Sequence, residues 1–278
     1  KDRLSEMILN ETFTMSPETK HTPMIKADPR PDKAVKDLPA VKTSLLTRHY
    51  SDMTALNMLD LTVNRGDLFG FIGSNGAGKT TTLRMIATML KPTTGTISVS
   101  SFNSVSDGQR VREQIGFMTG QTALYDRLTP TEMVKYIADL HGMDKAIFHK
   151  RKDRIFDILD MHSFADRRIS RLSTGMKQKT SIARTIIHDP QVMVFDEPTS
   201  GLDVMTSRAI VDLIRSCKEE GKTVIFSTHR MGEVNQLCDD IAIIYKGKLF
   251  YNSSFDQFKS EMTKPTFEEE FIYRVGEK

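Results

Sequence analysis

The stretch LFGFIGSNGAGKTTTL, residues 68–83, constrains the fold of this chain more than any other. The apolar run from Leu68 to Ile72 has the length and composition of a buried strand, and the residues from Lys79 onward can continue as a helix. Three glycines lie between these two segments, where a tight turn requires backbone freedom. The stretch therefore predicts a strand, a glycine-rich loop and a helix in that order.

The loop has the spacing G-x-x-x-x-G-K-[ST] of a phosphate-binding loop, or P-loop. Phosphates are bulky and multiply charged, so their site needs inward-pointing backbone N–H groups, little side-chain bulk and a cation. The glycines provide the first two, Lys79 is the cation, and the Thr80 hydroxyl is suited to bind Mg²⁺ beside the β- and γ-phosphates. The residues predicted to hold the nucleotide are Gly73, Ser74, Asn75, Gly76, Ala77, Gly78, Lys79, Thr80 and Thr81. A glycine-rich turn that binds nothing is the weaker alternative, so we expect a bound nucleoside triphosphate.

The composition is that of an ordinary globular protein, with 38% hydrophobic and 27% charged residues in a chain of 278. No apolar run approaches the roughly 18 residues that a helix needs to cross a bilayer, so we expect a cytosolic chain or one held at a membrane by another protein. The net charge of +3 comes from mixed signs along the sequence, which argues against a nucleic-acid surface. Cys217 and Cys238 lack metal-ligand spacing and are predicted to be ordinary, at least partly buried thiols.

Residues 1–39 differ from the rest of the chain. They contain five of its ten prolines and none of its sixteen glycines, with many charges and few large apolar side chains. Such a segment buries too little apolar surface to offset the entropy lost on ordering. We therefore predict an extended or disordered segment, followed by one domain over residues 40–278.

From Val41 the pattern is one of short strands separated by turns, which predicts a small, largely antiparallel β region that includes the P-loop strand. An all-helical insert follows, from about Thr122 to Ser170. Its first helix has a capping box, Thr129 to Glu132, with proline at the first helical position. Its second, over about residues 144–161, carries a basic run from His149 to Arg154, which we interpret as a solvated helix face rather than a nucleic-acid site.

From Pro190 onward, buried strands alternate with amphipathic helices. Strands are predicted in the sequences QVMVFDE, TVIFSTH and IAIIYKG, with helices near residues 204–220 and 231–237 between them. This alternation is typical of a parallel sheet covered on both faces. A last capping box, Thr266 to Glu269, predicts a C-terminal helix on this core.

Two further motifs offer chemistry toward a phosphate. The strand that ends in Asp196 and Glu197 can direct one carboxylate to Mg²⁺ and leave the next to polarise a water for attack on the γ-phosphorus. The sequence RLSTGMKQK, residues 171–179, opens another helix, and its Ser-Thr-Gly turn offers a hydroxyl and free N–H groups to an anion. Taken alone, that turn is better interpreted as a plain helix cap, because Ser and Thr are the usual capping residues.

The motifs occur in the order Walker A, signature, Walker B, D-loop and switch histidine. In chain order they are Gly73 to Thr80, Leu172 to Gln178, Asp196 with Glu197, Ser200 to Asp203, and His229. The chain thus resembles the nucleotide-binding subunit of an ABC transporter over about residues 41–276. Within that superfamily, the stretches STGMKQK and IGFMTGQTALYDRLT resemble ATPases that serve ABC-2-type exporters, including sodium-efflux and drug-resistance groups.

The resemblance implies a role for each motif. ABC ATPases act as head-to-tail dimers with two ATP molecules at the interface, so Ser173 and Gly175 are expected to contact the γ-phosphate held by the other subunit. Glu197 is expected to be the general base. His229 is expected to contact the γ-phosphate, and Asp203 to couple the two sites across the dimer.

Three positions need separate mention. Tyr50 lies where the family has an aromatic that stacks on adenine, although a strand-end tyrosine without that role is the alternative. The signature reads LSTGM where the family's most common form is LSGGQ, and its serine and second glycine survive. The loop that normally supplies a glutamine to Mg²⁺ and to the attacking water has Gly120 at that position and Gln121 one residue later. Either the backbone presents Gln121, or Mg²⁺ keeps a water there.

We therefore expect an α/β fold, with a P-loop NTPase core, an N-terminal antiparallel β subdomain and an α-helical subdomain over about residues 122–170. The expected activity is ATP hydrolysis, with ATP and Mg²⁺ as cofactors, that powers a separate membrane permease, the exporter type being favoured. The chain would act as a homodimer or beside a paired ATPase subunit, at the cytoplasmic face of the membrane and without nucleic acid. One alternative is a soluble ABC ATPase acting on nucleic acid or ribosomes. Another, an ATP-binding regulator without turnover, is disfavoured by the presence of Glu197 and His229.

Overall fold

The computed structural model describes residues 38–119 and 124–276. Most of the segment predicted to be extended or disordered, residues 1–37, lies outside the described residues. Gly120 and Gln121, the two candidates for the magnesium-ligand position, also lie outside them.

Four strands form an antiparallel sheet in the order β2-β1-β4-β5. They are β1 (Val41–Tyr50), β2 (Met53–Val63), β4 (Thr94–Val99) and β5 (Phe102–Asn103). The β1–β2 register places Val41 opposite Val63 and Tyr50 opposite Met53, so Tyr50 stands at the turn of this hairpin. The antiparallel β region predicted after Val41 is confirmed.

Six strands form a second sheet in the order β10-β9-β3-β8-β7-β6. They are β3 (Leu68–Ile72), β6 (Ile115–Met118), β7 (Val192–Asp196), β8 (Thr223–Thr228), β9 (Asp240–Tyr245) and β10 (Lys248–Ser254). All run parallel except β10, which is antiparallel to β9. β3, β7 and β8 are buried along their whole length, as expected for strands covered on both faces. The prediction that the P-loop strand belongs to the antiparallel region is wrong, because β3 pairs in parallel with β8 and β9.

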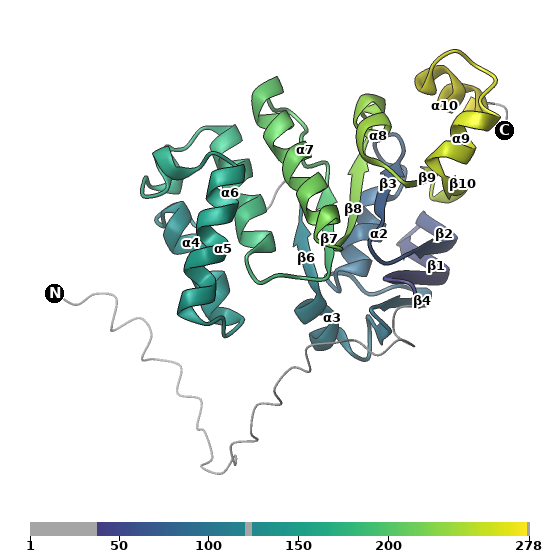
Figure 1. The fold of residues 1–278 in the computed structure, drawn as a ribbon. Helices are drawn as coiled ribbons and strands as arrows, with labels where there is room; N and C mark the ends of the chain where they lie inside the picture. The colour runs from purple at the N-terminus through teal and green to yellow at the C-terminus, as the bar shows by residue number, and fades with distance from the viewer. Residues whose placement is uncertain (1–37, 120–123, 277–278) are drawn as a thin grey trace, which may run out of the picture. The chain divides into compact units, whose positions relative to one another are not determined.

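Helices cover both faces of the parallel sheet and extend beyond its edges (Figure 1). They are α2 (Lys79–Ile86), α3 (Gly108–Gln114), α4 (Pro130–Leu140), α5 (Lys145–Ile158), α6 (Thr174–Ile186), α7 (Val204–Glu219), α8 (Met231–Leu237), α9 (Phe255–Glu261) and α10 (Phe267–Gly276). Two short 3-10 turns, His162–Phe164 and Ile169–Arg171, connect α5 to α6. In Figure 1, α4, α5 and α6 gather beside the β6 edge, whereas α9 and α10 lie at the β10 edge.

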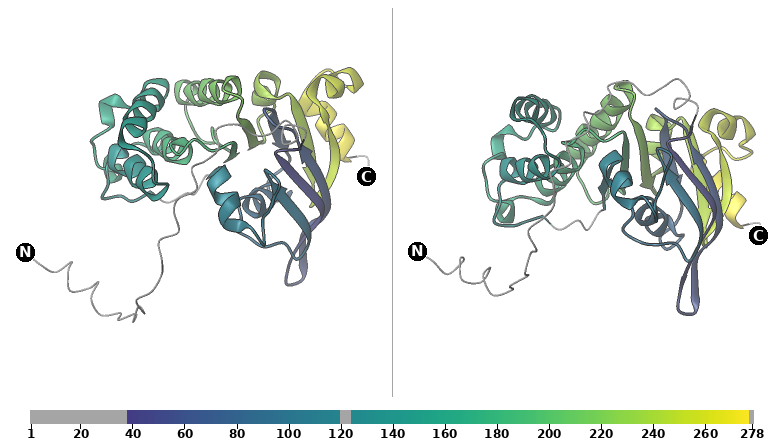
Figure 2. Two further views of the ribbon diagram at one scale, coloured as in Figure 1. Left: turned by 60° about the horizontal axis from the view of Figure 1, so that its bottom comes forward. Right: turned by 90° about the horizontal axis from the view of Figure 1, so that it is seen from below.

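Alternate residues of β7 point into two different hydrophobic cores. Val192 and Val194 belong to a core built from α2, the antiparallel sheet and one face of the parallel sheet. Met193 and Phe195 belong to a core built from α4, α5, α6 and α7 on the other face. Successive side chains of a strand point to opposite faces, so this single strand joins both cores. The helix α2 packs against both sheets, which places the P-loop at their junction (Figure 2).

The capping box that was predicted to open α4 is confirmed. The Thr129 side chain accepts a hydrogen bond from the Glu132 N–H, and the Glu132 side chain accepts one from the Thr129 N–H. The basic run on α5 is solvated only in part. Arg151 is half-buried and donates to the carbonyl oxygens of Ile186 and Ile187, so its interpretation as part of a solvated face is wrong.

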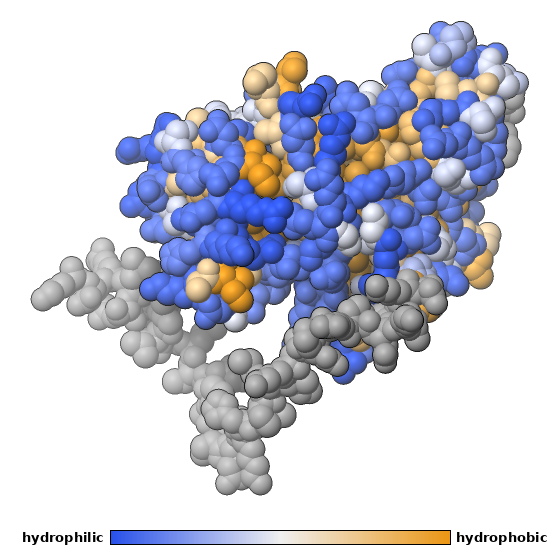
Figure 3. Space-filling model, in the orientation of Figure 1, coloured by the Kyte–Doolittle hydropathy of each residue, from blue (hydrophilic) through white to orange (hydrophobic). Residues whose placement is uncertain are grey.

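No helix within residues 38–119 and 124–276 is long and apolar enough to span a bilayer. The face drawn in Figure 3 is mostly hydrophilic, with small apolar patches between. Cys217 is buried and Cys238 is half-buried, and both are free thiols, as predicted.

Candidate nucleotide site

The P-loop connects β3 to α2. Two of its positions, Gly73 and Gly78, must be glycine because neighbouring strands leave no room for a Cβ. A Cβ on Gly73 would clash with the carbonyl oxygen of Ile244 in β9. Gly78, the N-cap of α2, has a φ of 111°, and a Cβ there would lie 2.9 Å from the carbonyl oxygen of Ala55 in β2. Because no side chain intervenes, the N-terminal end of α2 opens directly onto the loop, where its N–H groups favour an anion.

The Lys79 ammonium lies over this loop. Its Nζ donates hydrogen bonds to the carbonyl oxygens of Gly73 (2.6 Å) and Ser74 (3.2 Å), and the residue is only 5% exposed. Burial lowers the pKa of Lys79 below its ordinary value, and the carboxylates of Glu197 and Asp196 oppose that shift. The Nζ atom is 3.7 Å from Glu197 Oε1, so the predicted cation and the predicted base face each other.

Asp196, at the end of β7, is held by two hydroxyl groups. Thr80 Oγ1 donates to its Oδ2 at 2.8 Å, and Ser227 Oγ in β8 donates to its Oδ1 at 2.6 Å. The residue is 6% exposed, and a carboxylate that is buried to this degree needs such partners. The two oxygen groups predicted to bind a metal, on Thr80 and Asp196, are thus brought together across 116 positions of sequence.

Glu197 follows Asp196 in a left-handed backbone conformation, with a φ of 50°. Such a conformation costs energy for a residue other than glycine and is concentrated at functional sites. Its N–H donates to Ser227 Oγ at 3.0 Å, and its Oε1 is 3.2 Å from His229 Nδ1. The segment around His229 is held in turn by Glu233, which accepts a hydrogen bond from Thr228 Oγ1 at 2.8 Å. Glu197 is therefore fixed between the P-loop and His229.

A cavity of about 410 Å³ lies over the P-loop, within the size range of small-molecule sites. Its lining residues are Tyr50, Met53, Thr54, Ala55, Ser74, Asn75, Gly76, Gly78, Lys79, Thr80, Thr81, Glu197, Lys246 and Gly247. Tyr50 is 39% exposed, and the Arg48 guanidinium lies 4.5 Å from the centroid of its ring. The structure thus brings Tyr50 to the P-loop from the far end of β1. Gly73 and Ala77 belong to the same loop but do not line the cavity.

Sequence reasoning missed Lys246 and Gly247, which form the turn between β9 and β10. The Gly247 N–H donates to the Ala77 carbonyl at 2.9 Å, and the Gly247 carbonyl accepts from the Asn57 N–H at 2.8 Å. The turn is therefore held between the P-loop and β2, and Lys246 lines the nucleotide cavity together with Tyr50. A glycine after a buried strand signals a turn, but no local pattern says that this turn returns to the nucleotide loop.

The sequence is similar to ABC transporter proteins over most of its length. The family model described as "ABC transporter" matches residues 56–200, which include the P-loop and the Asp196–Glu197 pair. The ABC transporter ATP-binding protein NatA of Bacillus subtilis is 40% identical over 227 residues, which cover 78% of this chain and 91% of NatA. The chain belongs to the ABC transporter family of ATP-binding proteins.

Other ABC proteins agree with this assignment. The bacitracin transport ATP-binding protein BcrA of Bacillus licheniformis is 34% identical, with 81% of this chain and 72% of BcrA covered. A solved ATP-binding subunit of an ABC transporter has the same fold, with a TM-score of 0.79 at 24% identity over 84% of this chain and 99% of that one. A dimeric ATP-binding cassette in a post-hydrolysis state with ADP and Pi has a TM-score of 0.69 at 25% identity, over 77% and 98%. The chain is an ABC ATPase, and its predicted family, α/β fold class and enzyme class are confirmed.

In this ABC ATPase, Ser173, Gly175 and Asp203 are absent from the described lining of the chain's own nucleotide cavity. Ser173 Oγ caps α6 by accepting from the Met176 N–H at 3.3 Å, so the helix-cap interpretation is correct for the single chain. Asp203 caps α7 by accepting from the Thr206 N–H at 2.9 Å, and its bonds from the Thr206 backbone and hydroxyl lower its pKa. A Cβ on Gly175 would lie 3.2 Å from Thr206 Oγ1 and 3.8 Å from Asp203 Oδ2, so the signature lies beside the last residue of the D-loop. The role of all three toward a second subunit stays a prediction.

Proposed function

We propose that this ABC ATPase works as a pair of nucleotide-binding subunits whose closing on ATP and opening after hydrolysis power a separate membrane permease in the direction of export. The supporting observation is the position of Glu197, whose Oε1 is 3.7 Å from Lys79 Nζ and 3.2 Å from His229 Nδ1. A carboxylate held between a phosphate-binding cation and a histidine suits the attack of water on a γ-phosphate. Nucleotide binding alone does not require this arrangement, whereas ATP hydrolysis does.

Nucleotide binding uses the P-loop, Tyr50 and the β9–β10 turn. Lys79 exchanges its hydrogen bonds to two loop carbonyls for the negative oxygens of the β- and γ-phosphates, which are stronger acceptors. Arg48 covers one face of the Tyr50 ring, which leaves the other face for stacking on adenine. Lys246 adds a second cation to the same cavity.

The oxygen atoms of Thr80 and Asp196 fit a magnesium ion. A hydroxyl and a buried carboxylate, 2.8 Å apart, are hard donors, and magnesium at nucleotide sites takes one or two protein ligands and completes its shell with phosphate oxygens and water. Thr80 and Asp196 would hold the ion, with Gln121 as a further predicted ligand. When bound, it neutralises charge on the β- and γ-phosphates.

Hydrolysis uses Glu197 as the general base. Its carboxylate accepts the proton of the attacking water at Oε. The Glu197 carboxylate can only accept, so an Nδ1–H of His229 donates to its Oε1 at 3.2 Å and fixes it. Nε2 can donate to the γ-phosphate when the ring carries both protons. The Lys79 ammonium stabilises the negative charge on the transferred phosphoryl group.

A second subunit completes each site. Ser173 and Gly175 stand at the exposed N-terminal end of α6, which offers N–H groups and a hydroxyl to an anion. Because they do not line the cavity of their own chain, we assign them to the γ-phosphate bound by the other copy. Asp203 lies beside Gly175 and Thr206, where it can couple the two nucleotide sites of the dimer. Two solved dimeric structures of one ABC transporter cassette support this assembly.

Export by a separate permease is supported by the Nod factor export ATP-binding protein I of Ralstonia nicotianae, which is 33% identical over 78% of this chain and 68% of that protein. Besides NatA and BcrA, the relatives include the daunorubicin/doxorubicin resistance ATP-binding protein DrrA of Streptomyces peucetius. DrrA is 35% identical over 80% of this chain and 68% of its own length. A permease partner would hold the chain at the cytoplasmic face of the membrane. The substrate is selected by that partner.

Co-purification from detergent-solubilised membranes tests the proposal. We expect a tagged chain to bring down a multi-spanning membrane protein in a fixed ratio, and vesicles containing both to move a substrate only with ATP. A chain that stays in the soluble fraction with RNA or ribosomes would contradict the proposal and favour the soluble type of ABC ATPase.

A further inference from the structure

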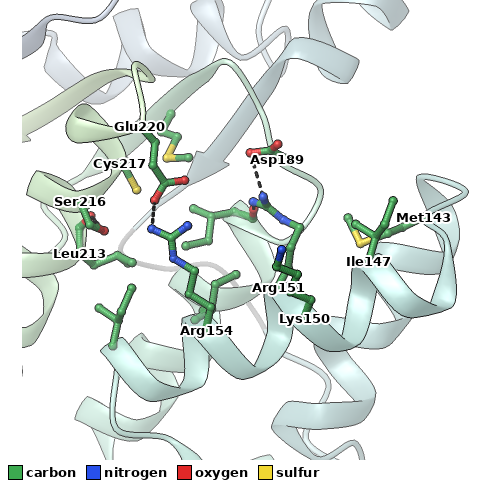
Figure 4. A pocket seen from close by; sticks show the side chains of 14 residues that line it. Met143, Ile147, Lys150, Arg151, Arg154, Asp189, Leu213, Ser216, Cys217 and Glu220 are labelled. Carbon is green, nitrogen blue, oxygen red and sulfur yellow. Dashed lines mark hydrogen bonds and ion pairs between the residues drawn. The ribbon is translucent and has the colours of Figure 1, made fainter. Parts of the chain in front are cut away.

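A second cavity, of about 390 Å³, lies between α5, the C-terminal half of α7 and the connection from α6 to β7 (Figure 4). It shares no lining residue with the nucleotide cavity. Its apolar lining includes Ile155, Ile158, Met193 and Leu213. The volume and the largely apolar lining are typical of small-ligand sites.

Cations from one face of α5 border this cavity. Lys150, Arg151 and Arg154 all line it, together with the carboxylates of Asp189 and Glu220. In Figure 4, the Arg151 side chain points to Asp189 and the Arg154 side chain points to Glu220, so the two arginines reach from α5 to the connection after α6 and to the end of α7. The basic run of the sequence therefore faces a cavity at these positions.

The two carboxylates are already neutralised. Asp189 Oδ1 is 3.1 Å from Arg151 Nη1 and 2.8 Å from Lys222 Nζ, and Glu220 is paired with Arg154. Among the described residues, the Lys150 ammonium forms no ion pair. Positive charge thus remains at the edge of an apolar surface, which favours an anion there.

We propose that this cavity binds an amphipathic organic anion, an apolar chain that carries one carboxylate. The apolar chain would bury surface against Ile155, Ile158 and Leu213, and the carboxylate would lie at Lys150 and Arg154. A nucleotide suits this surface less, because several charges would lie on an apolar lining. The thiol of Cys217, whose pKa burial raises to about 12, stays neutral and adds to that lining. A bound carboxylate would also compete with Glu220 for Arg154, which joins α5 to α7.

Calorimetric titration of the full chain with decanoate tests the ligand class. Decanoate should bind at one site, and decanol, which has the same chain without the charge, should bind at least about tenfold more weakly. Lys150→Gln should weaken decanoate binding about two- to fivefold, the range expected for one exposed ion pair. Lys145→Gln, at the exposed first position of the same helix and outside the cavity, is the matched control and should leave the affinity unchanged.

A tryptophan reporter locates the binding site. The chain has no tryptophan, and Ile147 lines the cavity while 54% exposed, so Ile147→Trp places a single emitter at the edge. Its emission should shift on addition of decanoate. Ser216→Phe fills part of the cavity and should abolish decanoate binding while ATP still binds. Absence of decanoate binding, equal affinity for decanoate and decanol, or unchanged affinity in both Lys150→Gln and Ser216→Phe would overturn the proposal.

Discussion

Glu197 Oε1 lies 3.2 Å from His229 Nδ1, although 32 positions separate the two residues in the sequence. They meet because β7 and β8 are neighbouring parallel strands, and each residue follows the carboxyl end of its strand. Lys79 approaches the same carboxylate from the P-loop at 3.7 Å. Removal of the base and removal of the cation should therefore give different kinetic signatures.

Glu197→Gln should lower kcat by about 10²- to 10⁴-fold, because the amide cannot accept the proton of the attacking water. ATP affinity should stay close to that of the wild type, since the P-loop is unchanged. Steady-state ATPase assays and size-exclusion chromatography with ATP would show slow turnover and a stable ATP-bound dimer. Glu219→Gln, on an exposed position of α7, is the control, and hydrolysis by Glu197→Gln at the wild-type rate would disprove the role of this base.

Lys79→Ala should act on binding itself. Loss of the buried cation removes charge-assisted hydrogen bonds to the phosphates, so the Kd for ATP should rise about 10- to 100-fold. The substitution also leaves the carbonyl oxygens of Gly73 and Ser74 without their lysine donor. Calorimetry would measure the affinity, with Lys91→Ala at an exposed position as the control. Equal affinities in both variants would contradict the P-loop assignment.

Lys246→Ala should weaken ATP binding about two- to fivefold, the range expected for one exposed ion pair. The effect should fade as salt is added, because exposed charges are screened. Lys248→Ala, two residues on and also exposed, lies outside the nucleotide cavity and is the matched control. Titrations at low and high salt would test both variants. An equal loss of ATP affinity in Lys246→Ala and Lys248→Ala would exclude a specific contact between the β9–β10 turn and the nucleotide.

Glu270→Gln should destabilise the C-terminal region in a pH-dependent way. Burial of Glu270, which is 1% exposed, raises its pKa, but the hydrogen bond from Arg274 and those from the Thr263 and Lys264 N–H groups outweigh it and lower the pKa to about 2. An unfolded glutamate titrates near about 4.3, so the stabilisation is present above that pH and is lost as the pH falls toward 2.

Urea unfolding checks this expectation. At pH 7 the free energy of unfolding should fall by about 1.5–3 kcal/mol in Glu270→Gln, the usual contribution of hydrogen bonds to a charged group. The difference from the wild type should shrink as the pH is lowered below about 4.3. Glu269→Gln, exposed on the same helix, should show neither effect. A difference that is constant with pH would mean that the carboxylate charge is unimportant.

Several elements escaped prediction for physical reasons. The strand β6 (Ile115–Met118) is only four residues long, too short for a periodic pattern, and its place in the sheet comes from pairing with β7. The strand β10 (Lys248–Ser254) consists of half-buried and exposed residues and carries no buried run. Arg151 was predicted to face solvent because runs of charged residues usually do. In the structure its guanidinium instead donates hydrogen bonds to the carbonyls at the end of α6, which partly buries it.

The sequence by itself determined the P-loop, the order of the five motifs and the family, because each motif depends on residues a few positions apart. The capping box at Thr129 could be read for the same reason. Only the tertiary structure decided that β3 lies inside a parallel sheet, that Thr80 binds Asp196, and that the turn at Lys246 reaches the nucleotide cavity. These contacts depend on strand order and on the closure of long connections, which a local pattern does not encode.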